Sequence, residues 1–386
     1  MLSLIDFIFT TLFNGLAGIS RDASLWFALI IIVTTAAITI KSRRNRLSLP
    51  EIVRLPAAGF EPGAGPEIAT GYAPAKPPDG DPPDCMVIIP ARNEQRTIAR
   101  AVRSLPADSV IVVDDASKDK TADLARQAGA GVVRAPKVSQ GTVGKANACT
   151  EGARLVASRW ILFADADTWY EPGFLESAIA AAEKGRVDFL SIYLRPAYES
   201  PGARMTAPYA VALYFFGVNP RTDPAEAFHG QCILVRREPY EFVGGHGAVR
   251  QYLNEDLKLA ALAARHRMKF GVARADALGQ VRIDPESFER DAHRFTIVSP
   301  WIGVRILLAA VAFSLWGPAF MWLIADGHRI LAIAMAIWPA LVLSHWYGWK
   351  LALLAPLGIY ALIPKLVNGT LGALAARRVE WKGRVI

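Results

Sequence analysis

The sequence predicts an α/β domain with a mostly parallel sheet, attached to membrane helices before and after it. Three observations support this fold class. Short apolar runs alternate with helical segments through the middle of the chain, as in sheets whose parallel strands are joined by helices. Acidic residues directly follow two of these runs. Long apolar stretches beside basic residues lie before position 46 and after position 300.

Composition supports more than one structural unit. The chain has 386 residues, of which 52% are hydrophobic. It is therefore too apolar for an ordinary soluble enzyme and long enough for about two units. We expect four segments: an N-terminal membrane anchor at 1–46, a Pro- and Gly-rich linker at 47–84, the α/β domain at 85–300, and a C-terminal membrane region with a basic tail at 301–386.

The N-terminal apolar run indicates a membrane anchor. Residues 24–40 are almost uncharged, and the basic segment 41–46 follows directly. Such a flank favours a transmembrane helix whose basic end stays in the cytoplasm. A cleaved signal peptide fits less well, because the charges follow the apolar stretch and no small-residue cleavage site separates them. Residues 1–19 fit either a first span or an interfacial helix.

Three apolar runs follow Pro300, at 301–325, 330–346 and 351–367, before a tail rich in Arg and Lys. A basic tail is expected in the cytoplasm. An even number of crossings would be needed to keep the α/β domain and the tail on the same side. We therefore expect one run to be interfacial or re-entrant, either 301–313 or 351–367. The predicted location is the cell inner membrane, with several spans and a cytoplasmic α/β domain.

The formal net charge of +8 does not indicate nucleic-acid binding. The basic residues concentrate beside apolar spans, and no basic stripe interleaves with aromatic residues. Anionic lipid headgroups explain the charge more simply. The cysteines Cys85, Cys149 and Cys232 have neither a metal-ligand spacing nor a paired framework, so we expect buried free thiols.

The first half of the α/β domain contains three expected strands. Residues 86–89 form a buried strand that Pro90 should end, and 94–105 place apolar residues on one helical stripe. Residues 110–113 form the second strand, directly before Asp114 and Asp115. A helix at 121–128 and a short strand at 132–134 complete this half. Ligands bind beyond the carboxyl ends of parallel strands, which places these aspartates at a candidate site.

The centre of the domain is a buried strand at 160–164, followed by Asp165 and Asp167. Side chains alternate along a strand, so two aspartates one residue apart are expected on the same side. Carboxylates gathered at a strand end suit Mg²⁺ or Mn²⁺, which in turn bind phosphates. The alternative is a strand ending in an ordinary polar turn.

A glycine-rich segment at 141–148 looks like a phosphate loop that opens a helix. It is not a Walker A motif, because Ser139 replaces the first glycine and Ala146 cannot bind Mg²⁺. The absence of a Gly-x-Gly-x-x-Gly segment after a strand argues against a dinucleotide-dependent dehydrogenase. Lys145 fits either a cation near a pyrophosphate or a solvated lysine at a helix start, and the sequence does not decide.

The second half of the domain adds a helix at 172–185, a strand at 189–193 and a glycine-flanked strand near 230. Glu255 and Asp256 then begin an amphipathic helix. Acidic residues in a first helical turn are often caps, but a carboxylate there can also accept a proton from an acceptor hydroxyl. The histidines have no ligand spacing and fit structural roles. No motif indicates a covalent nucleophile.

Taken together, these motifs resemble the family 2 glycosyltransferases with the GT-A fold, over roughly 85–300. The order matches that family: Pro90-Ala91-Arg92-Asn93-Glu94, Val113-Asp114-Asp115-Ala116-Ser117, Gly144-Lys145-Ala146-Asn147-Ala148, Asp165-Ala166-Asp167, and Glu255-Asp256. The resemblance implies inverting transfer of one sugar from a nucleotide-diphospho-sugar, with UDP-glucose as the default donor.

The resemblance also implies roles for individual residues. The donor would be bound by Pro90, Asn93, Glu94, Asp114, Asp115, Lys145 and Asp165. Asp167 would bind Mg²⁺ or Mn²⁺ at the diphosphate, and Asp256 would be the catalytic base, with Glu255 beside it. Gly230 and Gln231 would lie against the acceptor.

Within the family, the membrane segments and the closing residues 379–384 resemble the bacterial enzymes of hopanoid and carotenoid lipid glycosylation. A lipid hydroxyl at the membrane surface is therefore the expected acceptor. Processive members carry Gln-x-x-Arg-Trp after the base, whereas this chain has Arg-Asp-Ala-His-Arg-Phe at 290–295, which disfavours a polymer. Gln231 stands where related enzymes often have glycine, which leaves the acceptor open. The alternatives are a polysaccharide or polyprenyl-phosphate-linked transferase, and a non-catalytic membrane scaffold.

Overall fold

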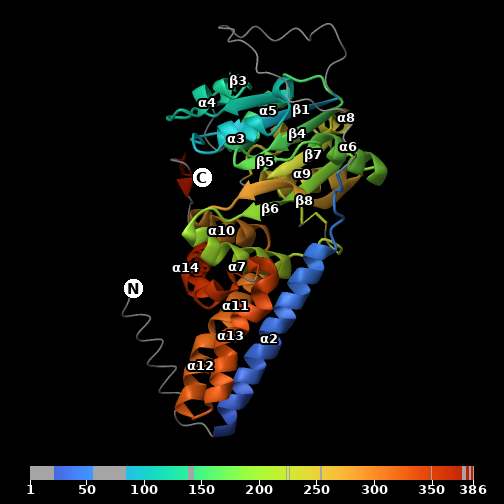
Figure 1. The fold of residues 1–386 in the computed structure, drawn as a ribbon. Helices are drawn as coiled ribbons and strands as arrows, with labels where there is room; N and C mark the ends of the chain where they lie inside the picture. The colour runs from blue at the N-terminus through green and yellow to red at the C-terminus, as the bar shows by residue number, and fades with distance from the viewer. Residues whose placement is uncertain are drawn as a thin grey trace. The chain divides into compact units, whose positions relative to one another are not determined.

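The computed structural model describes residues 21–54, 84–137, 143–222, 224–225, 227–252, 254–348, 350–375, 380–381 and 384–385. The chain divides into two compact units that do not follow chain order (Figure 1). The sheet unit comprises 48–197, 219–282 and 378–386. The helical unit comprises 1–47, 198–218 and 283–377. The expected first span or interfacial helix at 1–19 lies outside the described residues.

The sheet unit contains one eight-stranded sheet. Its strands are β1 (Cys85–Ala91), β2 (Val110–Asp114), β3 (Gly131–Arg134), β4 (Trp160–Ala164), β5 (Thr168–Tyr170), β6 (Phe189–Ala197), β7 (Cys232–Arg236) and β8 (Phe270–Arg282). The helices of this unit are α3 (Ile98–Arg103), α4 (Thr121–Gln127), α5 (Gly144–Ala153), α6 (Phe174–Gly185), α8 (Arg237–Phe242) and α9 (Glu255–Arg265). A 3₁₀ turn, η2 (Gly245–Val249), precedes α9.

The sheet order is β3-β2-β1-β4-β7-β6-β8-β5. Strands β3, β2, β1 and β4 are parallel neighbours, β7 is antiparallel to both β4 and β6, and β6 runs parallel to β8. The predicted mostly parallel α/β sheet is therefore confirmed. Because β1, β2 and β4 are parallel, their carboxyl ends share one edge, which carries Asp114 and Asp165.

The core on one face of the sheet joins it to α5 and α9. Ile88, Val113 and Ile161 from the strands pack in one cluster with Cys149 of α5 and Leu259 of α9. All five side chains are at most 1% exposed. Burial of this apolar surface is the main force that fixes α5 and α9 on the sheet. It determines where Lys145, at the start of α5, and Asp256, at the start of α9, are held.

Several element boundaries differ from the sequence predictions. Pro90 does not end β1, which continues to Ala91; pairing with β4 stops at Ile88, so the missing N–H of Pro90 falls where only β2 remains as a neighbour. The helix expected from residue 94 begins only at Ile98. Asn93 has a φ of 53°, and this left-handed residue turns the chain before the helix can start.

The strand alternation proposed for Asp165 and Asp167 is wrong. β4 ends at Ala164, and 165–167 form the turn into β5. The backbone N–H of Thr168 donates to the carbonyl of Asp165 at 3.2 Å, which closes this turn. The two carboxylates are therefore placed by turn geometry, which corresponds to the alternative considered from the sequence.

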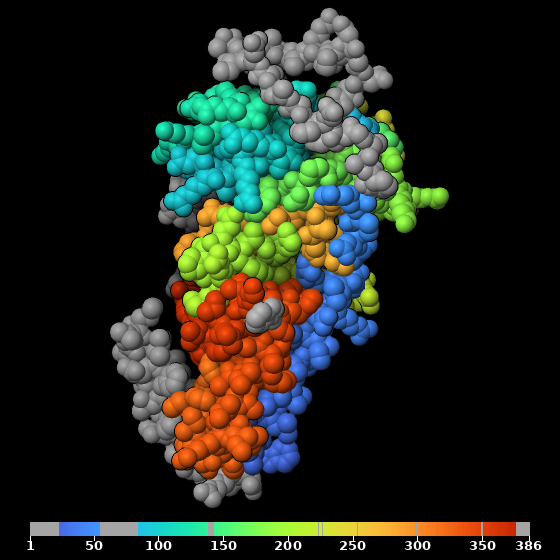
Figure 2. Space-filling model, in the orientation of Figure 1, coloured from blue at the N-terminus to red at the C-terminus, as the bar shows by residue number. Residues whose placement is uncertain are grey.

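The helical unit combines segments from three parts of the chain. It contains α2 (Arg21–Leu47), α7 (Pro201–Gly217), α10 (Phe288–Val298), α11 (Pro300–Ser314), α12 (Trp316–Ala325), α13 (Arg329–Tyr347) and α14 (Ala355–Leu374). In Figure 2, α2 (blue) lies beside the orange helices of this unit. Ile31 of α2, Leu323 of α12 and Met335 of α13 pack in one buried cluster.

Helix α7 comes from the middle of the chain and was not predicted. It is enclosed by the other helices of its unit, and Tyr209 at its centre is fully buried. Asn45 of α2 donates from Nδ2 to the carbonyls of Phe215 and Val218, at 2.7 and 3.0 Å. Carbonyls at a helix end lack intrahelical partners, so Asn45 caps α7.

Four helical stretches are long and apolar enough to cross a membrane: Ala23–Leu47, Pro300–Ala325, Arg329–Tyr347 and Ala352–Leu374. Each carries exposed apolar side chains, such as Ile30 (60%) and Ile330 (84%). Large apolar side chains in such number suit a lipid environment better than water. Which C-terminal run fails to cross, and on which side the α/β domain lies, stay predictions.

Candidate active site

The loops that follow β1 and β2 are joined by hydrogen bonds. The backbone N–H of Asn93 donates to Ser117 Oγ at 3.0 Å, and Asn93 Oδ1 accepts from the N–H of Lys118 at 2.8 Å. The N–H of Glu94 donates to Thr121 Oγ1 at 2.7 Å. Asn93 and Glu94 are therefore held next to the loop that carries the β2 aspartates.

Asp114 and Asp115 are both buried at the end of β2. Asp114 Oδ1 accepts from the backbone N–H of Ser117 at 3.2 Å, and Arg92 donates from a guanidinium nitrogen to the carbonyl of Asp115 at 2.6 Å. Ala116, which lies between Asp115 and Ser117, has a φ of 55°. The predicted donor residues Pro90, Asn93, Glu94, Asp114 and Asp115 thus line two neighbouring strand ends.

The turn after β4 is supported from beneath by buried hydroxyl groups. Thr168 donates from Oγ1 to the carbonyl of Asp165 at 2.7 Å, and Oγ1 also lies 2.9 Å from the hydroxyl of Tyr170. Burial raises the pKa of Tyr170 well above its usual value, so the phenol stays neutral. These contacts fix the backbone that presents Asp165 and Asp167.

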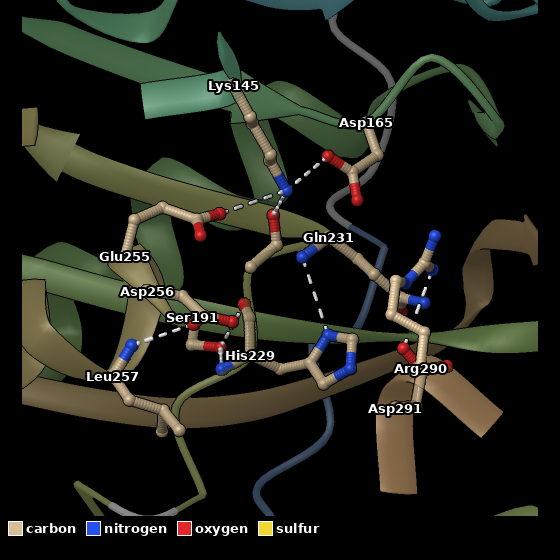
Figure 3. A network of polar contacts seen from close by, with 11 residues as sticks. Lys145, Asp165, Ser191, His229, Gln231, Glu255, Asp256, Leu257, Arg290 and Asp291 are labelled. Carbon is tan, nitrogen blue, oxygen red and sulfur yellow. Dashed lines mark hydrogen bonds and ion pairs between the residues drawn. The ribbon is translucent and has the colours of Figure 1, made fainter. Parts of the chain in front are cut away.

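Lys145 joins three parts of the site (Figure 3). Its Nζ lies 2.6 Å from Asp165 Oδ1, 3.1 Å from the carbonyl oxygen of Gly230 and 3.6 Å from Glu255 Oε1. Burial alone would lower the pKa of Lys145, but the charges of Asp165 and Glu255 outweigh it and raise the pKa. The alternative of a solvated lysine at a helix start is therefore wrong.

Asp256 lies beside this junction in the first turn of α9. It is 4% exposed, and its Oδ1 accepts the backbone N–H of Leu257 at 2.9 Å. Gly230 is packed directly against it, because a Cβ at position 230 would lie 2.9 Å from Asp256 Oδ2. The backbone carbonyl of the neighbouring Gln231 accepts a hydrogen bond from the N–H of Asp165 at 2.9 Å. The predicted acceptor segment thus connects Asp165 with Asp256.

Comparison with known proteins identifies the larger part of this unit. Residues 86–244 match the family model described as glycosyl transferase family 2. This match covers less than half of the chain, and we call the matched region, 86–244, the family 2 domain. It contains every predicted site residue except Glu255 and Asp256. The family match and the sheet topology agree with the GT-A fold predicted from the sequence.

The family 2 domain has curated relatives in Staphylococcus aureus. The 4,4'-diaponeurosporenoate glycosyltransferase of that organism is 30% identical over 187 residues, which are 45% of this chain and 50% of the relative. The chain thus spans about half the length of the curated relatives it matches.

Two solved structures resemble the chain at low identity. The mannosyltransferase PcManGT from Pyrobaculum calidifontis, in complex with GDP-Man and Mn²⁺, is 16% identical, covers 92% of this chain and 98% of its own, and has a TM-score of 0.49. Glucosyl-3-phosphoglycerate synthase from Mycobacterium tuberculosis, with Mg²⁺ and UDP, is 17% identical, covers 57% and 79%, and has a TM-score of 0.39.

The family 2 domain offers few protein ligands for a metal ion. Among the described residues, no group of three or more His, Cys, Asp or Glu side chains could hold one. Asp165 is bound by Lys145, and Asp167 is half-buried in the same turn. Mg²⁺ at phosphate sites commonly uses only one or two carboxylates, with the rest from substrate and water. The residues therefore fit a metal that arrives with a diphosphate.

A buried pair near Asp256, formed by Tyr240 and His246, was not predicted from the sequence. Tyr240 OH accepts the backbone N–H of His246 at 3.0 Å and lies 2.9 Å from His246 Nδ1. The phenol is the donor to Nδ1 when the imidazole proton is on Nε2, and the acceptor when it is on Nδ1. The ring of Phe163 contacts His246 at 4.5 Å between centroids. The glycines at 244 and 245 were the only sequence signal for this close packing.

The buried imidazole predicts a pH-dependent stability. Burial lowers the pKa of His246 from its ordinary 6.5 to about 3, with the charge of Lys145 acting in the same direction. The unfolded chain therefore binds more protons between these values, so stability is complete above pH 6.5 and falls as pH drops towards 3. The loss is at most about 5 kcal/mol. In His246→Phe, thermal unfolding of the detergent-solubilised chain is expected to depend less on pH across this window. The exposed His266→Phe should keep the wild-type slope.

Gly230→Ala is expected to reduce activity without unfolding the family 2 domain. The added Cβ would displace the Asp256 carboxylate by a few tenths of an ångström, because Oδ2 and Cβ of Asp256 lie at 2.9 and 3.1 Å. Misplaced catalytic groups cost up to about 10²-fold in rate. Gly247→Ala is the matched control, since its nearest neighbour would be Thr150 at 3.6 Å. Equal turnover in both variants would show that the contact at position 230 is unimportant.

Proposed function

We propose that the protein transfers a single sugar from a nucleotide-diphospho-sugar to a membrane lipid, with inversion at the anomeric carbon. The observation that carries this proposal is the junction at Lys145. Its ammonium group bridges Asp165, on the donor side of the family 2 domain, and Glu255, next to the candidate base Asp256. This contact supports the proposal because it links the residue assigned to the donor with the neighbour of the residue assigned as base.

The proposed chemistry is a single displacement. Asp256 takes the proton of the acceptor hydroxyl while that oxygen bonds to the anomeric carbon, and the bond from this carbon to the diphosphate oxygen breaks. A divalent ion, when bound, neutralises charge on the leaving diphosphate. Asp167 is the residue that would hold this ion, and Asp165 remains paired with Lys145.

The donor's base and ribose are assigned to the loops after β1 and β2. Asn93, Glu94, Asp114 and Asp115 offer acceptor oxygens there, held by the hydrogen bonds between the two loops. Pro90 lies in the strand directly before them. Bound nucleotides in the similar structures are UDP and GDP-Man, so UDP-glucose remains only a default donor.

The lipid acceptor and the location rest on different support. Four candidate spans belong to the same chain as the family 2 domain, and the S. aureus relative is named for 4,4'-diaponeurosporenoate. The basic residues in the last turns of α2 favour a cytoplasmic domain at the inner membrane. The proposed lipid class is a hopanoid or carotenoid, and Gly230 and Gln231 are the residues assigned to it.

The test uses membranes from cells that express the full chain. They are incubated with labelled UDP-glucose and other nucleotide sugars, with Mn²⁺ or with EDTA, and the lipids are extracted and separated. Label in a lipid of one added sugar, absent in Asp256→Asn and in EDTA, supports the proposal. Label in a water-soluble polymer, or in a polyprenyl phosphate, would instead support the alternative transferases. No label with any donor, together with no nucleotide binding, would favour a non-catalytic scaffold.

A further inference from the structure

We propose that the sheet unit carries a second anion site, for a phosphate or diphosphate group. It lies at the start of β4, at the opposite end of this strand from Asp165. A cavity of about 430 Å³ opens there. We call it the basic pocket. It is lined by Arg159, Trp160, Ala182, Glu183, Arg186, Val187, Asp188, Arg236 and Lys269.

The topology separates the basic pocket from the candidate active site. Trp160 is the first residue of β4, and Asp165 follows its last residue. Five residues of strand span roughly 16 Å, so one ligand of ordinary size cannot occupy both places. Arg236 ends the antiparallel β7 and is paired with Trp160 in the sheet. Arg186 follows α6, and Lys269 directly precedes β8. Four separate segments thus bring a cation to one edge.

The charges in the basic pocket are unbalanced. It has four cations and two carboxylates. Arg159 pairs with Glu183 at 2.8 Å and Arg236 with Asp188 at 3.7 Å, but both arginines are more than 40% exposed. Exposed pairs of this kind contribute little, so their guanidinium groups can turn to another anion. Arg186 and Lys269 have no ion pair within the described part of the chain. The excess of two positive charges matches a phosphate dianion.

Trp160 gives this pocket a structured floor. The guanidinium carbons of Arg159 and Arg236 lie 5.9 and 5.8 Å from its ring centroid, within the range of cation–π attraction. Its indole N–H is buried and lacks a hydrogen-bond partner among the described residues. A buried donor without a partner is unusual and is satisfied by a ligand oxygen or a bridging water. Paired guanidinium forks favour phosphate over a single carboxylate.

The test is equilibrium dialysis of the full detergent-solubilised chain with labelled inorganic pyrophosphate, in EDTA to prevent metal-dependent binding at the active site. We expect saturable binding that Arg186→Ala/Lys269→Ala weakens at least tenfold. Lys184 lies on α6, outside the pocket, and the Lys184→Ala variant should bind pyrophosphate as the wild type does. The exposed positions of all three side chains leave the fold intact, which thermal unfolding checks.

Two outcomes would overturn the proposal. One is equal binding of pyrophosphate by the double variant and the wild type. The other is that UDP displaces pyrophosphate in proportion to the occupancy of the active site by UDP. A second arm compares free phosphate with short-chain phosphatidic acid as competitor. Stronger displacement by the lipid would identify a headgroup as the ligand, and stronger displacement by phosphate a soluble metabolite. The result is independent of sugar transfer, so it does not depend on the proposed function.

Discussion

Asp256→Asn is expected to lower the rate of sugar transfer by about 10²- to 10⁴-fold, the usual contribution of a general base. The amide has the size of the carboxylate and can still accept the N–H of Leu257 through its oxygen. What it loses is the ability to take the acceptor's proton. Nucleotide binding should therefore change little, because the loops proposed to bind the nucleotide follow β1 and β2, whereas Asp256 lies in the first turn of α9.

The measurement combines turnover at saturating donor with the dissociation constant of the nucleotide. A large fall in turnover with unchanged nucleotide affinity assigns Asp256 to the chemical step. Asp123→Asn serves as a matched control, since Asp123 lies on α4 with its side chain 72% exposed and, among the described residues, pairs only with Arg126 in an exposed contact. If Asp256→Asn retained wild-type turnover, the proton would have to go to another group, and Glu255 would be the next candidate.

The strands that could be predicted are those with a strong local signal. The boundaries of β4 at Trp160 and Ala164 agree with the prediction, because an apolar run there is bounded by polar residues on both sides. β8 could not be predicted in this way. Its sequence, Phe-Gly-Val-Ala-Arg-Ala-Asp-Ala-Leu-Gly-Gln-Val-Arg, contains residues of low strand propensity. Pairing with β6 and β5 holds it in the sheet, and that information is not local.

The candidate site shows the same division between local and distant information. The motifs that carry Asp114, Asp165 and Asp256 stand out in the sequence, and the parallel strand ends predicted a common edge for Asp114 and Asp165. The contact of Lys145 with Glu255 joins residues 110 positions apart, and no spacing rule relates them. The packing of Tyr240 under His246 also depends on tertiary structure, although the two are close in sequence. Residue types could therefore be predicted, but not their partners.

Lys145→Met is expected to destabilise the sheet unit by about 1–3 kcal/mol, less than a fully buried ion pair would cost, because the side chains of Lys145 and Asp165 are 22% and 27% exposed. The variant leaves Glu255, whose side chain is 4% exposed, and Asp165 without their shared cation. It also leaves the carbonyl of Gly230 without the ammonium donor. Unfolding in urea, followed by fluorescence of the detergent-solubilised chain, measures the effect. Lys184→Met, exposed on α6, is the control and should unfold as wild type does.

A double-mutant cycle separates the ion pair from simple loss of packing. If Lys145 acts through the charge of Glu255, then Glu255→Gln should cost less in the Lys145→Met background than in the wild type, because the ion pair that it breaks is already lost there. Additive losses would mean that the two side chains do not interact, and the junction would then be no more than a packing contact. A coupling above about 1 kcal/mol, with transfer lost in Lys145→Met even where the chain is folded, would show that this cation holds the donor side and the base helix in register.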